Sequence, residues 1–124
     1  MKDPERSPVY GALRNPSMVD YPGRLAVVVF TSGCNFACRV CHNAELRNRQ
    51  AGRMHWDQVD ALLRRHREQW VDAVVITGGE PTLDPDLPEL IERIRALGLA
   101  VKLDTNGSRP DVLRAVLPLV DTVA

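Results

Sequence analysis

The three cysteines of this chain fall within eight residues, as Cys34, Cys38 and Cys41, in the sequence CNFACRVC. A secreted disulfide scaffold would spread an even number of cysteines along the chain, so this grouping favours ligation of a metal or cluster in a reducing cytoplasm. Three thiolates in one loop can hold a cube-shaped iron–sulfur cluster, which normally takes four protein ligands. Because the sequence has no fourth cysteine, one iron would stay open to a substrate or cofactor.

A zinc ion held by Cys34, Cys38, Cys41 and His42 is the competing interpretation. Adjacent Cys41 and His42 are an awkward pair for one tetrahedral ion, and zinc motifs usually join Cys-x2-Cys units across a longer gap. The cluster is therefore favoured, and zinc stays as the alternative.

Two further loops carry residue types that suit ligand binding. In the first, Gly78 and Gly79 allow close approach of the backbone to a ligand, and Glu80 offers a carboxylate to an ammonium group. In the second, Asp104 closes an apolar strand and is followed by Thr105 and an Asn-Gly pair, which is common turn chemistry. Each loop alone is typical of an ordinary turn, and only the cysteines give them weight.

The elements that must position these loops alternate between buried strands and amphipathic helices. In chain order they are a strand at Arg24–Thr31, a helix at Trp56–Trp70, a strand at Asp72–Thr77, a helix at Pro88–Leu97, a strand at Leu99–Asp104, a helix at Pro110–Leu117 and a strand at Leu119–Ala124. This order predicts a parallel α/β sheet with right-handed crossovers. Ligands bind such sheets at the carboxyl ends of the strands, where all three loops fall, so we expect a single site there.

Finer expectations concern the first helix and its surroundings. Asp57 is a candidate cap at its start, and Gly98 is expected to stop the second helix. The buried stripe of the first helix is expected to comprise Trp56, Val59, Leu62, Leu63, His66 and Trp70. Solvated positions are expected at Arg64, Arg65 and Arg67 on that helix and at Arg47, Arg49, Arg53 and His55 in the preceding loop.

Length and composition place limits on the classes of protein. With 124 residues, 44% of them hydrophobic and 26% charged, the chain is expected to form one small domain at most. We expect residues 1–23, with four prolines, to form an irregular lead-in segment with room for a short edge strand, and residues 24–124 to form the core. The zero net charge argues against a nucleic-acid-binding domain. The longest apolar run, Leu25–Phe30, is far shorter than the roughly 20 residues of a membrane helix, and no secretory signal is visible, so a cytoplasmic location is expected.

The motifs together resemble the radical SAM superfamily. They are MVDYPG (Met18–Gly23), VVFTSGCNFACRVCHN (Val28–Asn43), VVITGGEPTL (Val74–Leu83) and VKLDTNG (Val101–Gly107). The resemblance runs from about Met18 to the last residue and is strongest to activating proteins of anaerobic ribonucleoside-triphosphate reductases, a group of glycyl-radical-enzyme activases. It implies a partial parallel (β/α) barrel with about four strands present, as the N-terminal part of a domain whose sheet continues.

The resemblance also implies the roles of individual residues. Cys34, Cys38 and Cys41 would ligate a [4Fe–4S] cluster whose open iron chelates S-adenosylmethionine. Val40 and His42 would flank this cofactor, its amino group would meet Gly78, Gly79 and Glu80, and the far side of the pocket would be lined by Asp104 and Thr105. The position of Val40 is usually aromatic in the family, so this chain keeps an apolar contact without ring stacking.

The implied reaction is one-electron reduction of the sulfonium, which gives methionine and a 5′-deoxyadenosyl radical. That radical would take a Cα hydrogen from a glycine of the partner, an anaerobic ribonucleoside-triphosphate reductase, and the electron would come from a flavodoxin- or ferredoxin-type donor. No general acid or base is implied. Two alternatives stay open: another radical SAM enzyme, such as a peptide maturase or a different activase, and an inactive remnant or zinc-binding interaction module.

Overall fold

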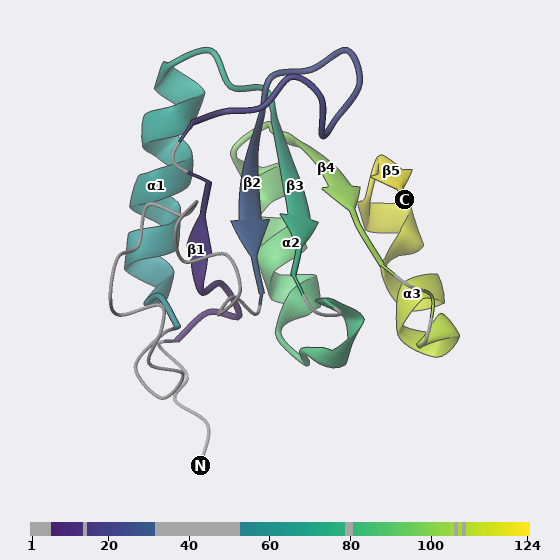
Figure 1. Ribbon diagram of the computed structural model, residues 1–124. Helices are drawn as coiled ribbons and strands as arrows, with labels where there is room; N and C mark the ends of the chain where they lie inside the picture. Colours follow the sequence, from purple (N-terminus) through teal and green to yellow (C-terminus); the bar gives the residue numbers. More distant parts are fainter. Residues whose placement is uncertain (1–5, 14, 32–52, 79–80, 106, 108) are drawn as a thin grey trace.

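The computed structural model describes residues 6–13, 15–31, 53–78, 81–105, 107 and 109–124. Its strands are β1 (Gly11–Ala12), β2 (Ala26–Phe30), β3 (Ala73–Thr77), β4 (Ala100–Leu103) and β5 (Thr122–Val123). Its helices are α1 (Trp56–Glu68), α2 (Leu87–Ala96) and α3 (Pro110–Val116), with short 3-10 turns η3 (Pro81–Leu83) and η4 (Leu117–Leu119). The strands form one sheet in the order β1-β2-β3-β4-β5, in which only β1 is antiparallel to its neighbour (Figure 1).

This architecture confirms the predicted fold class, a mostly parallel α/β sheet that matches part of a (β/α) barrel. The fifth strand, β1, is the short edge strand expected within the lead-in segment. One detail differs from the expectation. The last strand begins at Thr122 rather than Leu119, because Pro118 has no N–H for a sheet ladder and fits the 3-10 turn η4 that extends α3.

The two sides of the sheet are built from alternate residues of each strand. All three helices pack on one side (Figure 1), where the strand side chains are at most 1% exposed. These side chains are Val27, Val29, Val74, Ile76, Val101 and Leu103. Full burial of one such side chain contributes about 1.5–3 kcal/mol, so this layer holds the helices to the sheet.

The opposite side of the sheet, here called the inner face, carries smaller side chains. Ala26, Ala73 and Ala100 stand next to one another in register across β2, β3 and β4. Tyr21 of the lead-in segment belongs to the apolar cluster on this face and is only 8% exposed. The inner face is therefore partly covered by chain that precedes the first parallel strand.

The first helix differs from its predicted form at both ends. Its N-cap is His55, whose backbone N–H donates to the Gln58 side-chain oxygen at 2.9 Å, and Asp57 lies inside the first turn. The predicted stripe is buried from Trp56 to His66, but Trp70 lies beyond the helix end and is 87% exposed. Burial lowers the pKa of His66, and the nearby Arg65 lowers it further.

None of the described helices combines the length and apolarity needed to cross a membrane.

Trp70 occupies a backbone conformation that suits glycine. Its φ of 74° lies in the left-handed region, and the N–H groups of Trp70 and Val71 bond to carbonyls of the last helical turn. Helix α2 ends with the same pattern of bonds, but there the left-handed residue is Gly98, with a φ of 79°. A left-handed residue with a Cβ costs roughly 1–2 kcal/mol, so α1 ends with strain that α2 avoids.

We therefore expect Trp70→Gly to raise the free energy of unfolding by about 0.5–1 kcal/mol, because strain is relieved while an exposed side chain gives up little burial. Urea denaturation of the parent and the variant measures this change in the free energy of unfolding. Gly98→Ala is the matched control: a Cβ there meets no atom within 4 Å, so only backbone strain is added and stability should fall by about 1 kcal/mol. A loss of stability in Trp70→Gly would contradict the strain account.

Candidate functional site

The carboxyl ends of β2, β3 and β4 are joined to one another by hydrogen bonds. The Thr31 N–H donates to the Thr77 carbonyl at 2.9 Å, and the Thr31 hydroxyl donates to the same carbonyl at 3.2 Å. The Asp104 N–H donates to the Ile76 carbonyl at 2.9 Å. Ladder bonding thus continues one residue past β2 and one residue past β4, and the carboxyl ends of the three strands lie side by side at one edge of the sheet.

The predicted site residues divide into two groups. Gly78, Asp104 and Thr105 are described, and all three lie at this edge, directly after β3 and β4. The others fall outside the described residues, so their placement stays a prediction; they are Cys34, Cys38, Val40, Cys41, His42, Gly79 and Glu80. The segment that contains the cysteines begins one residue after Thr31, at the same edge.

Gly78 and Thr105 shape the two described loop entrances. Gly78 has a φ of 114°, a conformation that side chains rarely adopt, so a glycine is required where the chain turns out of β3. The Thr105 N–H donates to the Ala124 carbonyl at 2.9 Å, and its hydroxyl oxygen accepts the Gly107 N–H at 3.1 Å. The loop after β4 is thereby tied to β5 and folded into a turn.

Asp104 contributes the carboxylate of the described part of the site. Its Oδ1 atom lies 3.5 Å from the Nζ atom of Lys102, which precedes it on the inner face of β4. This oxygen is buried and has no hydrogen-bond partner among the described residues, although 33% of the side chain is exposed. A buried acceptor without a donor is costly, which marks Asp104 as a group suited to a ligand.

Lys102 contacts the predicted site residue Asp104 but is not itself among the predicted site residues. Its signal is visible in the alternation of LAVKLD: Val101 and Leu103 face the helices, so the residue between them must face the inner side. A lysine at a position with 14% side-chain exposure is uncommon and needs polar partners.

Arg53 anchors the chain where it returns from the cysteine-containing segment. Its guanidinium forms an ion pair with Asp84, whose side chain is 9% exposed, in the loop that follows η3. The same guanidinium lies over the Tyr10 ring at 5.9 Å, and the Arg53 carbonyl accepts a hydrogen bond from Arg6 at 2.5 Å. The expectation that Arg53 is solvated is therefore wrong, because its side chain is partly buried and pairs with the largely buried Asp84 carboxylate.

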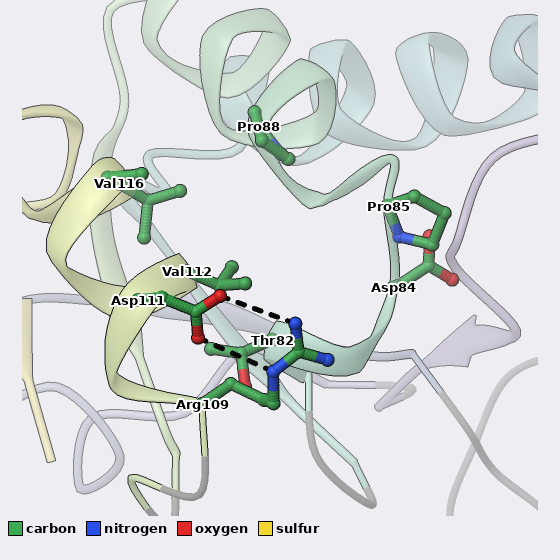
Figure 2. A pocket seen from close by; sticks show the side chains of 9 residues that line it. Thr82, Asp84, Pro85, Pro88, Arg109, Asp111, Val112 and Val116 are labelled. Carbon is green, nitrogen blue, oxygen red and sulfur yellow. Dashed lines mark hydrogen bonds and ion pairs between the residues drawn. The ribbon is translucent and has the colours of Figure 1, made fainter.

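A cavity of about 580 Å³ opens on the helix side of this edge, between the start of α2 and α3 (Figure 2). Apolar groups such as Pro88 and Val112 face each other across it, and Arg109 and Asp111 form an ion pair at its rim with an N–O distance of 3.4 Å. This pair lowers the pKa of the Asp111 carboxyl below its ordinary value, chiefly through a hydrogen bond from Arg109. Of the predicted site residues, the three that the structure describes, Gly78, Asp104 and Thr105, do not line this cavity.

The residue types at the carboxyl ends of β2, β3 and β4 and in the segments that follow them suit an iron–sulfur cluster and a polar cofactor. The described residues alone contain no group of three His, Cys, Asp or Glu side chains that could hold a metal ion. The thiol donors belong instead to the segment that leaves β2, and three thiolates suit an iron–sulfur cluster. The Asp104 oxygen at the neighbouring strand end, which lacks a hydrogen bond among the described residues, offers a polar contact to a second group.

Comparison with known proteins identifies the family. The family model described as the Radical SAM superfamily matches residues 28–124. The chain therefore belongs to the radical SAM superfamily, a class of enzymes whose chemistry depends on S-adenosylmethionine and an iron–sulfur cluster.

Three relatives illustrate the range within this class. A Methanocaldococcus jannaschii protein named "Putative glycyl-radical enzyme activating enzyme" is 36% identical over 87% of this chain and 45% of its own length. A Sulfolobus acidocaldarius "Probable GTP 3',8-cyclase" is 37% identical over 64% of this chain and 26% of its own length. A Hyperthermus butylicus "7-carboxy-7-deazaguanine synthase" is 36% identical over 73% of this chain and 38% of its own length. The chain spans less than half the length of these relatives, and no solved structure matches it.

The Arg53–Asp84 pair gives a direct test of how the edge is held. Asp84→Asn should lower the free energy of unfolding by about 2 kcal/mol, because it leaves a half-buried guanidinium without its counter-charge. Glu89→Gln is the matched control: it breaks the more exposed pair with Arg93 and should cost about 0.5 kcal/mol or less. Equal losses in the two variants, measured by urea denaturation, would show that the pair does not anchor the loops.

Proposed function

We propose that this chain forms the cofactor-binding part of a radical SAM activase that generates a glycyl radical on an anaerobic ribonucleoside-triphosphate reductase. The observation that carries the proposal is the joining of the exits of β2, β3 and β4 at one edge. The cysteine-containing segment follows the first exit, the Gly-Gly-Glu-Pro sequence the second, and Asp104 lies at the third. One ligand can therefore meet residues from all three strands.

In this proposal, each predicted site residue keeps a defined role. Cys34, Cys38 and Cys41 ligate a [4Fe–4S] cluster. S-adenosylmethionine is flanked by Val40 and His42, its amino group is received by Gly78, Gly79 and Glu80, and the far side of its pocket is formed by Asp104 and Thr105. When bound, the cluster supplies the electron that cleaves this cofactor reductively, and the chemistry belongs to the two bound groups.

The chain's own residues bind, orient and shield. Phe30 and Val28 lie on the inner face below the site and are at most 4% exposed, so they form a dry apolar floor. A dry floor protects a reactive species from water. The orientation of the ligand depends on the fixed strand exits, above all on the backbone of Gly78 and the carboxylate of Asp104.

Activation of a glycyl-radical enzyme is supported by the extent of similarity. The relative with the activating-enzyme name matches 87% of this chain, whereas the cyclase relative matches 64% at nearly the same identity. The partner would be the reductase, and the electron donor a flavodoxin- or ferredoxin-type protein. Another radical SAM reaction is the second candidate, since relatives with cyclase and deazaguanine-synthase names match well over half of the chain.

Metal analysis after anaerobic reconstitution separates the cluster from zinc. We expect roughly four iron and four acid-labile sulfide per chain, and loss of both in Cys38→Ser. His42→Ala is the matched control, because the cluster needs only the three thiolates and should survive. Zinc without sulfide in the parent chain, with loss of that zinc in His42→Ala, would contradict the proposal.

The partner is tested by mixing the reconstituted chain with S-adenosylmethionine, a reductant and an anaerobic ribonucleoside-triphosphate reductase. We expect an organic radical on the reductase, detected by electron paramagnetic resonance, and none on a reductase whose radical-bearing glycine is replaced by alanine. Cofactor cleavage that yields no radical on the reductase, but that is accelerated by GTP, would favour the second candidate.

A further inference from the structure

Lys102 is the one charged side chain that β4 places on the inner face of the sheet. Its cross-strand neighbours are Val75 and Thr122, and its side chain is 14% exposed. An ammonium group in this position needs polar partners, since its burial without them would destabilise the fold. Two partners are present, one in the lead-in segment and one directly after β4.

The first partner belongs to the lead-in segment, which crosses the inner face. Ser17 and Ala26 exchange two backbone hydrogen bonds of 2.7 and 2.8 Å at the start of β2. The Asp20 carbonyl then accepts a hydrogen bond of 2.5 Å from the Lys102 ammonium. Beyond it, the Tyr21 hydroxyl lies 3.4 Å from the Thr122 hydroxyl of β5. The segment thus contacts the sheet at β2, β4 and β5.

The Asp20 carbonyl is held in place by its own turn. The Ser17 hydroxyl donates to the Asp20 carboxylate at 2.5 Å and accepts the Asp20 N–H at 3.2 Å. Fixed in this way, the turn presents a carbonyl to Lys102 that does not depend on the residues of the cofactor edge.

The second partner is Asp104, whose Oδ1 lies 3.5 Å from the same ammonium. This oxygen is buried and lacks a hydrogen bond among the described residues, so the ion pair with Lys102 compensates its charge. The Lys102 ammonium therefore contacts both the Asp20 carbonyl and the Asp104 carboxylate.

We infer that Lys102 is a positioning residue that, held by the Asp20 carbonyl, sets the place of the Asp104 carboxylate at the cofactor edge. The lead-in segment would then help to position Asp104, because its Asp20 carbonyl holds the Lys102 ammonium. The role assigned to Asp104 toward S-adenosylmethionine rests on the proposed function, whereas the link between Lys102 and Asp104 does not.

The test combines two double-mutant cycles on Lys102→Met, Asp104→Asn and the double variant. In the first cycle, calorimetry measures binding of S-adenosylmethionine to the reconstituted chain. We expect about tenfold weaker binding in each single variant and no further loss in the double variant, because Lys102 acts through Asp104. Lys102→Arg should bind within about threefold of the parent, since the charge is kept. Arg114→Met is the control: it removes a positive charge from an exposed position of α3 and should leave binding of S-adenosylmethionine unchanged.

The second cycle measures urea unfolding of the cofactor-free chain. A link between the two side chains predicts non-additive losses, with a coupling of about threefold or more in the unfolding equilibrium constant. Additive losses here, or additive losses of cofactor affinity, would overturn the inference. A parent chain that binds no S-adenosylmethionine would contradict the proposed function, and the unfolding cycle would still decide the role of Lys102.

Discussion

The parallel register of β2, β3 and β4 is the constraint on which the rest of this structure depends. Val28 is aligned with Val75 and Val75 with Lys102, so the three strands end within one residue of the same level. The hydrogen bonds of Thr31 and Asp104 then extend the ladder past the strand ends. Because side chains alternate along a strand, a slip of one residue would move Asp104 to the helix side and its buried neighbour Leu103 to the inner face. The site and the core are fixed by the same backbone bonds.

The difference between the two faces of the sheet keeps this register. Large aliphatic side chains fill the helix side, where they are almost fully buried. The row of Ala26, Ala73 and Ala100 on the inner face leaves room for Tyr21, so the lead-in segment can lie close to the sheet. Close approach in turn allows the ammonium of Lys102 to reach the Asp20 carbonyl. Small residues at one end of the inner face are thus connected to the position of a carboxylate at the other end.

Periodicity was sufficient to predict the parallel strands, because β2 and β3 are buried on both faces and appear as runs of β-branched residues. It failed where a tertiary contact decides the outcome. Trp70 fits a helical stripe by spacing, yet the α1 stop precedes it and leaves it exposed. Arg53 resembles a solvated loop residue until Asp84, far along the sequence, supplies its partner.

The same limit applies to the site. The edge that gathers Gly78, Asp104 and Thr105 follows from strand order, which the sequence determines. Lys102 was overlooked since its importance comes from Asp20, 82 positions away, through a segment with no regular pattern. The bounds of the short edge strand β1 could not be predicted, because two residues carry no period.

The central claim is that one edge of this sheet holds both a cluster with an open iron and S-adenosylmethionine. Electron paramagnetic resonance of the anaerobically reconstituted and reduced chain, recorded with and without S-adenosylmethionine, tests it most directly. The account predicts the signal of a reduced four-iron cluster that changes when the cofactor is added, since the cofactor occupies the open iron. A cluster signal that is indifferent to the cofactor, or no cluster signal after controlled reconstitution, would contradict it.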